Sequence, residues 1–225
     1  MNPATILKSF ARNVRERGLG SAIKLLARRA SIRRKESFFS INTEAVVFLP
    51  ELGIDNPDCN EYQATDYEVF DTMIQGLEIE PAEHVFLDYG AGMGRAMVLA
   101  ATYPFKKVLG VEIAPELAVI GQRNIDQCRS KVRCQDITLT NEDATRYVPD
   151  PDVTLCYFNN SFTGEVLESV LRNVKQFSTE QHPVLLVCNL PNRSPFEDQI
   201  TKHDGLNLKK EFTLSSIRKC LVFST

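Results

Sequence analysis

The fold is decided by the stretch Val85-Phe86-Leu87-Asp88-Tyr89-Gly90-Ala91-Gly92-Met93-Gly94-Arg95 and by the run Val108-Leu109-Gly110-Val111-Glu112 that follows it. Each of these two apolar runs ends in a carboxylate, and the first continues into three closely spaced glycines. This order is typical of a buried strand, a tight loop, a helix and a second strand. In such units the loop and the following helix N-terminus face a nucleoside-like ligand. We therefore expect a cofactor site here.

Each residue of this loop has a physical task. Gly90 and Gly92 allow a positive φ and let the backbone approach a ligand without a Cβ atom. Asp88 adds a carboxylate beside the loop, which suits a cationic group such as the ammonium of an amino acid. Glu112 ends the next strand, where a carboxylate can accept both hydroxyl groups of a ribose.

Two common nucleotide loops fit less well. A dinucleotide loop follows G-x-G-x-x-G, whereas here Gly94 comes one residue early and Arg95 takes the place of the third glycine. A carboxylate at Asp88 would also repel a pyrophosphate. The phosphate-binding pattern G-x-x-x-x-G-K-[ST] is absent from the sequence. An NAD(P)-dependent oxidoreductase and a domain that only binds a ligand remain as alternatives.

The periodicity of the chain predicts an α/β fold. The expected helices cover residues 67–77, 94–103, 116–128 and 163–177, and the expected strands cover 84–88, 108–112, 132–139, 153–158, 184–188, 206–214 and 217–223. The strand at 184–188 is apolar without alternation, which indicates burial on both faces. We predict a doubly wound, mostly parallel, seven-stranded sheet with a C-terminal antiparallel hairpin.

Composition narrows the class of protein. With 43% hydrophobic and 24% charged residues, the chain reads as a globular protein, and it has no apolar run of the length of a membrane span. Its six cysteines never form a C-x-x-C pair, and its three histidines are scattered. We expect free thiols in a reducing cytoplasm, no disulfide and no zinc.

The charge is concentrated at the N-terminus. Residues 1–40 hold ten Lys or Arg residues but only two acids, Glu16 and Glu36. Apolar residues at helical spacing predict an amphipathic helix that Gly18 and Gly20 interrupt; they are Ile6, Leu7, Phe10, Val14, Ile23, Leu25 and Leu26. We assign 1–59 to a basic helical extension and 60–225 to the ligand-binding domain. The extension could pack on the acidic body, bind an anionic partner, or act as an organellar presequence.

The pattern Asp88-x-Gly90-x-Gly92-x-Gly94 with a downstream Glu112 resembles class I, seven-strand, Rossmann-like methyltransferases. The resemblance implies S-adenosylmethionine as the cofactor and S-adenosylhomocysteine as its product. It also implies that three further residues contact the adenine, namely Ile113 on its face and Asp143 and Ala144 at its edge. A polar turn with an Asx cap is the other interpretation of Asp143.

Upstream residues sharpen this resemblance. Tyr62-x-x-Thr65 and the later run Asn159-Asn160-Ser161-Phe162 are similar to the non-SET histone-lysine methyltransferases and their small bacterial relatives, over about residues 60–175. By this resemblance Tyr62 and Thr65 are cofactor contacts. Asn159 is both a cofactor contact and the catalytic residue, at the opening of the site (the mouth) where the methyl group is transferred. Ser161 departs from the family pattern because it stands before the phenylalanine.

The mouth predicted at residues 159–162 carries amides but no general base. A phenol or alcohol acceptor needs such a base, which Asp66, Glu165 or His203 could supply through folding. An amine has to arrive neutral, and an amide-lined, partly apolar mouth disfavours the ammonium form. We therefore favour an amine acceptor, either a protein lysine or a small molecule. The alternatives are a small-molecule O-methyltransferase and a cofactor-binding module that recruits an anionic partner through residues 1–40.

Overall fold

The computed structural model describes residues 19–225, which fall into two compact units, one ending at Ile41 and one beginning at Asn42. In the first unit, α2 (Leu19–Phe39) is a helix of 21 residues that contains Gly20 in its first turn. This helix confirms a helical N-terminal extension over these residues. The predicted apolar positions Ile6, Leu7, Phe10 and Val14 and the predicted break at Gly18 lie outside the described residues.

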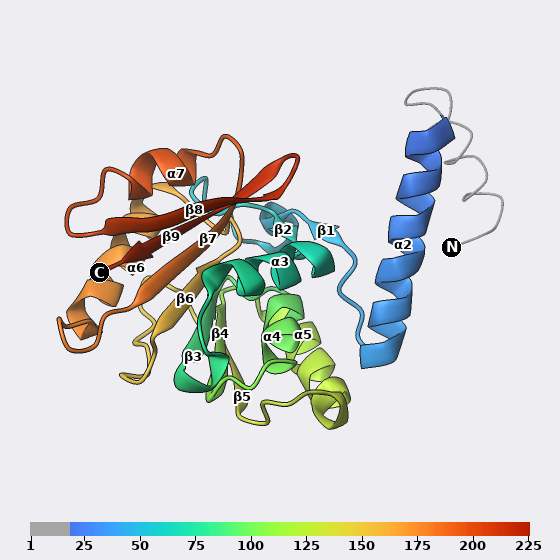
Figure 1. Ribbon diagram of the computed structural model, residues 1–225, viewed down its shortest axis with the longest axis horizontal. Coiled ribbons are helices and arrows are strands. Elements are labelled where there is room, and N and C mark those ends of the chain that lie inside the picture. The colour runs from blue at the N-terminus through green and yellow to red at the C-terminus, as the bar shows by residue number, and fades with distance from the viewer. Residues whose placement is uncertain (1–18) are drawn as a thin grey trace. The chain divides into compact units, whose positions relative to one another are not determined.

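The second unit is built on a seven-stranded sheet (Figure 1). Its strands, in spatial order, are β5 (Ile137–Asn141), β4 (Lys107–Glu112), β3 (Val85–Tyr89), β6 (Leu155–Phe158), β7 (Leu185–Pro191), β9 (Arg218–Ser224) and β8 (Asn207–Ser215). The pairs from β5 to β7 are parallel, whereas β9 runs antiparallel to both of its neighbours. The predicted mostly parallel sheet and its C-terminal hairpin are confirmed.

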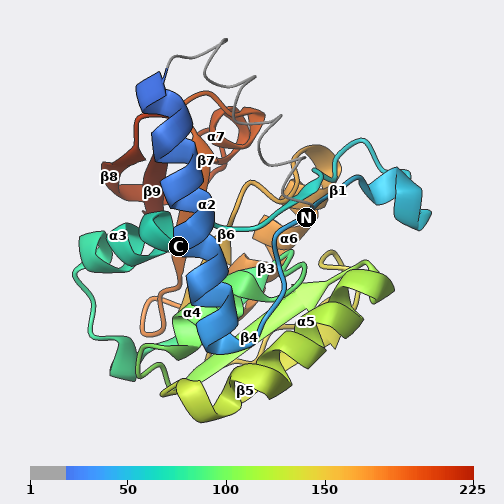
Figure 2. The same cartoon turned by 90° about the vertical axis from the view of Figure 1, so that its right-hand side faces the viewer.

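Helices cover both faces of this sheet (Figure 2). On one face, α6 (Gly164–Phe177) and α7 (Pro195–Ile200) bury apolar side chains against the odd-numbered positions of β3. On the other lie α3 (Tyr67–Leu77), α4 (Arg95–Ala101) and α5 (Pro115–Cys128). All five residues of β3 are buried, as expected for a strand covered on two sides. The doubly wound arrangement is therefore confirmed.

Two sequence expectations about local structure were wrong. The third strand begins at Ile137 and not at Val132, because the backbone N–H groups of Arg133 and Cys134 donate to the Ala101 carbonyl at the end of α4. The sequence predicts no helix between the strand at 184–188 and the C-terminal hairpin, but the structure has the short helix α7 there, which Ser194 caps by accepting a hydrogen bond from the Phe196 N–H at 3.2 Å. Short 3-10 turns also occupy Pro81–Glu83 and Arg129–Lys131.

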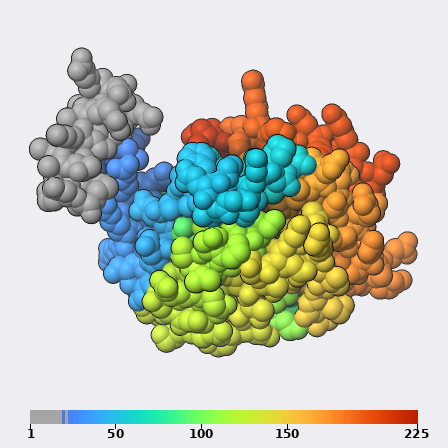
Figure 3. Space-filling view, turned by 180° about the vertical axis from the view of Figure 1, so that it is seen from behind, coloured from blue at the N-terminus to red at the C-terminus, as the bar shows by residue number. Residues whose placement is uncertain are grey.

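Residues 42–65, which we call the covering segment, belong to the second unit. The segment holds a two-stranded antiparallel sheet, β1 (Val46–Val47) with β2 (Tyr62–Gln63), and a 3-10 turn at Leu49–Leu52. It is joined to the loop after β6, because the Asn60 N–H donates to the Ser161 carbonyl at 3.0 Å and the Thr163 N–H donates to the Asp58 carbonyl at 2.7 Å. Figure 3 shows its surface, in cyan, bordering later parts of the chain.

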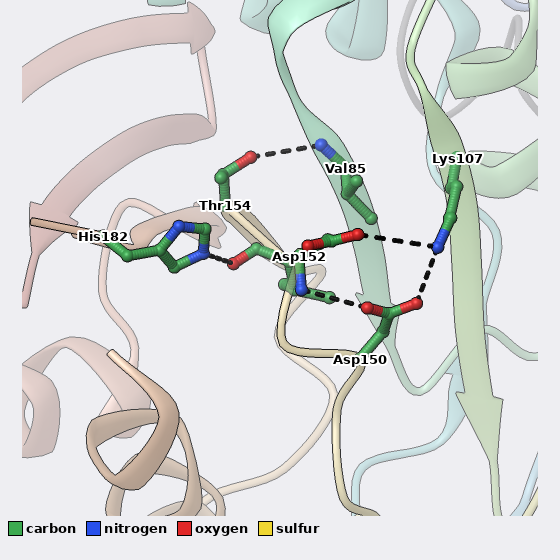
Figure 4. Close-up of polar contacts among 7 residues, drawn as sticks. Val85, Lys107, Asp150, Asp152, Thr154 and His182 are labelled. Carbon is green, nitrogen blue, oxygen red and sulfur yellow. Dashed lines mark hydrogen bonds and ion pairs between the residues drawn. The ribbon is translucent and has the colours of Figure 1, made fainter. Parts of the chain in front are cut away.

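A polar cluster lies at the amino ends of the strands, at the edge of the sheet opposite the glycine loop (Figure 4). The Lys107 ammonium pairs with Asp150 at 2.8 Å, and Thr154 Oγ1 accepts a hydrogen bond from the Val85 N–H at 3.1 Å. The Lys107–Asp150 pair raises the pKa of Lys107 and lowers that of Asp150. Because both groups are partly exposed, this pair contributes little to stability. The cluster anchors the chain that enters β6.

All six cysteines are free thiols; five are buried and Cys59 is half-buried. Over residues 19–225, no helix is both long and apolar enough to cross a membrane. In the same range no cluster of three or more His, Cys, Asp or Glu side chains has the arrangement of a metal site.

Candidate active site

A cavity of about 340 Å³ opens at the carboxyl end of β3, where the strand order switches between β4 and β6. This volume lies in the range of small-molecule sites. Nine of the predicted cofactor residues line the cavity: Tyr62, Thr65, Asp88, Gly90, Glu112, Ile113, Asp143, Ala144 and Asn159. Gly92 and Gly94 do not line it. The strands and the covering segment therefore bring the predicted residues together around one space.

Glu112 connects the end of β4 to the glycine loop. Its Oε2 accepts a hydrogen bond from the Gly92 N–H at 2.7 Å, and its Oε1 accepts one from the Ala114 N–H at 2.8 Å. Burial raises the pKa of Glu112, while these backbone hydrogen bonds act to lower it. Each carboxylate oxygen can accept a second hydrogen bond. Glu112 can therefore hold the loop and still receive two ribose hydroxyls.

Asp88 is a second buried carboxylate of the cavity, with 2% of its surface exposed. Burial, together with the nearby charge of Glu112, raises its pKa to about 8. Without a ligand this carboxyl group is largely protonated at neutral pH. A cationic ligand would favour its ionised form, whereas a pyrophosphate would add more negative charge to the same space. The cavity is thus built for a ligand that carries positive charge.

Gly92 and Gly94 shape the loop from outside the cavity. Gly92 has a φ of 55°, and a Cβ atom added to it would collide with the Tyr62 ring. The covering segment therefore packs Tyr62 directly on the glycine loop, and the Tyr62 hydroxyl donates to the Thr43 carbonyl at 3.0 Å. Gly94, with a φ of 79°, begins α4 and approaches the backbone of Gly121 in α5.

Asp143 fits both of its sequence interpretations. Its Oδ1 accepts hydrogen bonds from the Thr145 N–H at 2.9 Å and the Thr145 hydroxyl at 2.8 Å, which forms an Asx turn. The same residue lines the cavity beside Ala144. Its Oδ2 makes no hydrogen bond within residues 19–225. This oxygen is therefore available to a ligand.

Asn159 is held in place by a polar network at the carboxyl edge of β6, β7 and β9. Its Oδ1 accepts from Arg218 Nη2 at 2.9 Å and from Asn189 Nδ2 at 3.0 Å, and its Nδ2 donates to the Gln63 carbonyl at 3.0 Å. Because a guanidinium can only donate, the amide orientation of Asn159 follows from this contact. Asn189 is almost fully buried and also donates to the Tyr157 hydroxyl at 3.1 Å. The network leaves Asn159 little freedom to turn.

A second cavity, of about 350 Å³, adjoins the first. The two cavities share six lining residues: Leu49, Cys59, Asn60, Glu61, Gln63 and Asn159. Arg218 lines the second cavity and not the first. Asn159 therefore stands where the two spaces meet, which is the position expected of a residue between a cofactor and an acceptor.

Sequence reasoning missed several cavity residues. It weighed Asp66, Glu165 and His203 as bases, but of these only Glu165 lines the cofactor cavity, since Asp66 caps α3 and His203 lies in a surface hollow beside Glu168. It did not consider Glu61, which lines both cavities. Because Tyr62 is a predicted cofactor contact, its neighbour in the sequence, Glu61, could have been expected beside the same site.

Arg95 is a second residue whose role was missed. It is 4% exposed, lines the cofactor cavity and lies over the Tyr67 ring at 5.0 Å. Its Nε donates to Thr43 Oγ1 at 2.5 Å, and its Nη1 donates to the Thr65 carbonyl at 3.3 Å. Its presence in place of a third fingerprint glycine therefore has a structural reason, because Arg95 ties the covering segment to the start of α4.

The residues present fit S-adenosylmethionine. The buried Asp88 suits its ammonium group, Glu112 suits its ribose, and Asp143 Oδ2 suits the amino group of its adenine. The charges of the site agree with a cofactor that carries both an ammonium and a sulfonium group. The buried carboxyl groups of Asp88 and Glu112, in a cavity that further acidic residues also line, would oppose a pyrophosphate-containing dinucleotide.

Comparison with known proteins supports this assignment. Residues 58–146 match the family model described as histone methylation protein DOT1. No curated protein matches the chain in sequence. The matched residues run from the covering segment through the glycine loop, Glu112 and Asp143, and so contain most of the cofactor cavity.

Solved structures share the fold at low identity. A S-adenosylmethionine-dependent methyltransferase from Aquifex aeolicus superposes with a TM-score of 0.58 at 12% identity, over 78% of this chain and 97% of that one. An RNA methyltransferase from Salinibacter ruber, in complex with S-adenosyl-L-homocysteine, superposes with a TM-score of 0.53 at 16% identity, over 72% of this chain and 93% of that one. The ribosomal protein L11 methylase from Lactobacillus delbrueckii subsp. bulgaricus superposes with a TM-score of 0.51 at 17% identity, over 69% of this chain and 75% of that one.

The fold is therefore that of the class I, Rossmann-like methyltransferases. Together with the family match, it identifies the chain as an S-adenosylmethionine-dependent methyltransferase. The structural neighbours are named for different acceptors, so the shared fold does not set the acceptor.

Proposed function

We propose that the protein transfers a methyl group from S-adenosylmethionine to an amine nitrogen. The observation that carries this proposal is the composition of the junction between the two cavities. Asn60, Gln63 and Asn159 supply amides there, Leu49 and Cys59 supply apolar surface, and Glu61 is its one carboxylate. In the described chain no histidine lines either cavity.

In this proposal the cofactor lies in the first cavity. Asp88 and Glu112 hold its ammonium and ribose groups, and Tyr62 and Thr65 close the site from the covering segment. Ile113, Asp143 and Ala144 surround the adenine, and Gly90 leaves room for the backbone to approach. Gly92 and Gly94 act by shaping the loop, because neither reaches the cavity.

Asn159 is proposed as the catalytic residue because it stands at the junction. When bound, S-adenosylmethionine supplies a methyl group on a positively charged sulfur, which an acceptor lone pair displaces in line. The chain needs to align the acceptor and exclude water, and alignment alone can contribute several kcal/mol. The fixed amide of Asn159 serves that alignment.

The lack of a well-placed strong base favours nitrogen over oxygen. An amine needs only to arrive in its neutral form, which the apolar and amide surface of the junction favours. Glu61 is exposed and can attract an ammonium group and receive its proton. A hydroxyl acceptor would require a base positioned on the reacting oxygen, which makes a small-molecule O-methyltransferase the second candidate.

The test uses S-adenosylmethionine labelled with 13C in its methyl group. The protein is incubated with a cell extract, and the labelled product is examined by NMR, where N-methyl and O-methyl carbons have different chemical shifts. We expect label in N-methyl groups with the wild-type protein and none with Asp88→Ala. Label in O-methyl groups would contradict the proposal. The acceptor fraction, whether protein or small molecule, is read in the same experiment.

A second role concerns the N-terminal extension. Six basic residues of α2 are accompanied by a single acid, Glu36; the basic residues are Lys24, Arg28, Arg29, Arg33, Arg34 and Lys35. This charge supports an anionic partner for residues 1–40. Deleting residues 1–40 should remove partner binding and leave cofactor affinity unchanged, and an interaction insensitive to salt would count against this role. A cytoplasmic location and a domain boundary near residue 60 stay predictions.

A further inference from the structure

Arg218 is a cation with spare hydrogen-bonding capacity on the wall of the second cavity. Its Nε donates to Asn189 Oδ1 at 2.7 Å, and its Nη2 donates to Asn159 Oδ1 at 2.9 Å and to the Asn189 carbonyl at 2.8 Å. These three bonds fix the plane of the guanidinium. Its Nη1, with two N–H groups, makes no hydrogen bond to any residue between 19 and 225.

Within residues 19–225 Arg218 forms no ion pair with a carboxylate, although the negative charge of Asp66 lies near enough to act on its pKa. All three of its hydrogen-bond acceptors are neutral amide oxygens. Burial lowers the pKa of the guanidinium, although an arginine stays protonated at any physiological pH. A half-buried cation held rigidly by neutral partners is an unusual arrangement, because buried charges are normally paired.

We propose that Arg218 binds a carboxylate or phosphate group of the methyl acceptor, so that the substrate is a small amine that also bears an anionic group. The proposal rests on the assignment of the second cavity to the acceptor. A guanidinium with a fixed plane and free N–H groups is the preferred partner of such anions. The cavity of about 350 Å³ has room for a small molecule.

Arg218 lies close to the place where the methyl group would be transferred, so an anionic group bound to it would lie near the reacting nitrogen. Arg218 contacts Asn159 directly, and Asn159 marks the boundary with the cofactor cavity. Glu61 lines the same second cavity and offers an opposite charge for the amine. The cavity thus presents one cation and one anion, which matches an acceptor with both an anionic group and an amino group.

The affinity of the protein for S-adenosylhomocysteine is first measured by calorimetry, and the protein is then kept saturated with this ligand. Acetate and inorganic phosphate are then titrated separately, with chloride replaced at constant ionic strength. The variants are Arg218→Gln, Arg218→Lys and, as a matched control, Lys209→Gln, which removes an exposed charge from the same hairpin outside the cavity. The side-chain NMR signal of 15N-labelled Arg218 reports the contact directly.

We expect saturable binding of at least one anion by the wild-type protein and by Lys209→Gln, and binding at least about tenfold weaker for Arg218→Gln. Arg218→Lys should retain part of the affinity, and S-adenosylhomocysteine should bind all four proteins alike. The preferred anion indicates whether the substrate is a carboxylate or a phosphate. A purely positioning role of Arg218 would leave anion binding absent in every protein, and that result would overturn the proposal.

A second measurement identifies the product class. Labelled methyl groups transferred in a cell extract should appear in small molecules that an anion exchanger retains at a pH where amines are neutral. Label confined to macromolecules, or a product that is not retained, would overturn the proposal. If S-adenosylhomocysteine does not bind, the proposed function fails, and the anion titration of the ligand-free protein still decides the role of Arg218.

Discussion

Glu112 Oε2 accepts a hydrogen bond from the Gly92 N–H at 2.7 Å, so the end of one strand fixes the loop that follows its neighbour. The same carboxylate binds the Ala114 N–H through its other oxygen. A residue proposed to bind the ribose therefore also sets the shape of the glycine loop. Substitutions at Glu112 should affect both properties.

Replacing Glu112 by Gln tests both properties in one variant. The amide can still accept one backbone hydrogen bond, but its NH₂ group faces a backbone N–H, so one buried donor loses its partner. We expect a loss of about 1–3 kcal/mol in unfolding free energy and a loss of measurable affinity for S-adenosylhomocysteine. Urea unfolding and calorimetry measure the two effects. Unchanged affinity in a folded variant would contradict the assigned role.

Replacing Asp88 by Asn should stabilise the ligand-free protein at high pH. The pKa of Asp88 is about 8 in the folded protein, against 3.8 for an unperturbed group. Between these values folding takes up a proton, so the wild type loses stability as pH rises, with a limiting slope of about 1.4 kcal/mol per pH unit. The neutral amide avoids this loss.

The advantage of Asp88→Asn over the wild type should therefore grow from pH 5 to pH 8, as followed by thermal unfolding at each pH. The same variant should bind S-adenosylmethionine more weakly, because the amide cannot carry the negative charge that faces the ammonium. A stability difference that is independent of pH would show that the Asp88 carboxyl group does not titrate in this window.

Replacing Gly92 by Ala should lower the free energy of unfolding for two reasons. The positive φ accounts for about 1–2 kcal/mol, and the collision of the new Cβ atom with the Tyr62 ring accounts for about 1–3 kcal/mol more. Gly53→Ala is the matched control, because Gly53 has a φ of 76° with no atom near its Cβ position. Adding Tyr62→Ala to Gly92→Ala should recover part of the second cost in urea unfolding. Equal effects of Gly92→Ala and Gly53→Ala would argue against the packing of Tyr62 on the loop.

Replacing Asn159 by Ala should lower kcat by about 100-fold, since the alignment of the acceptor is lost. The affinity for S-adenosylhomocysteine should change by less than about tenfold, because Asn159 meets the cofactor only at its reacting end. Asn192→Ala, at an exposed amide that bonds the Ser216 carbonyl, is the control. A variant with full kcat would remove Asn159 from the catalytic role.

The part of the fold that sequence could predict is the part fixed by local pattern. The run from Val85 to Glu112 encodes strand, loop, helix and strand within 28 residues, and its carboxylates lie where the pattern placed them. The third strand was misplaced because the amides of Arg133 and Cys134 pair with Ala101, a contact that no local pattern marks.

The rest of the site depends on distant pairing. Arg218 meets Asn159 because β9 returns antiparallel beside β7, with Arg218 opposite Pro191 and Cys220 opposite Asn189. Neither Arg218 nor Asn189 belongs to a sequence motif. A polar residue at the carboxyl end of an apolar strand was the available signal for Asn189, because Asn159 occupies the same position in the neighbouring strand.

The most direct test of the account is calorimetry of the wild-type protein with S-adenosylmethionine, S-adenosylhomocysteine and NAD, in two buffers of different ionisation enthalpy. We predict binding of the first two ligands and not of NAD. At pH 7 binding of S-adenosylmethionine should release protons, and its affinity should rise from pH 6 toward pH 7.5, because the ammonium favours the ionised form of Asp88. Binding of NAD, with no heat from S-adenosylmethionine or S-adenosylhomocysteine, would contradict the account.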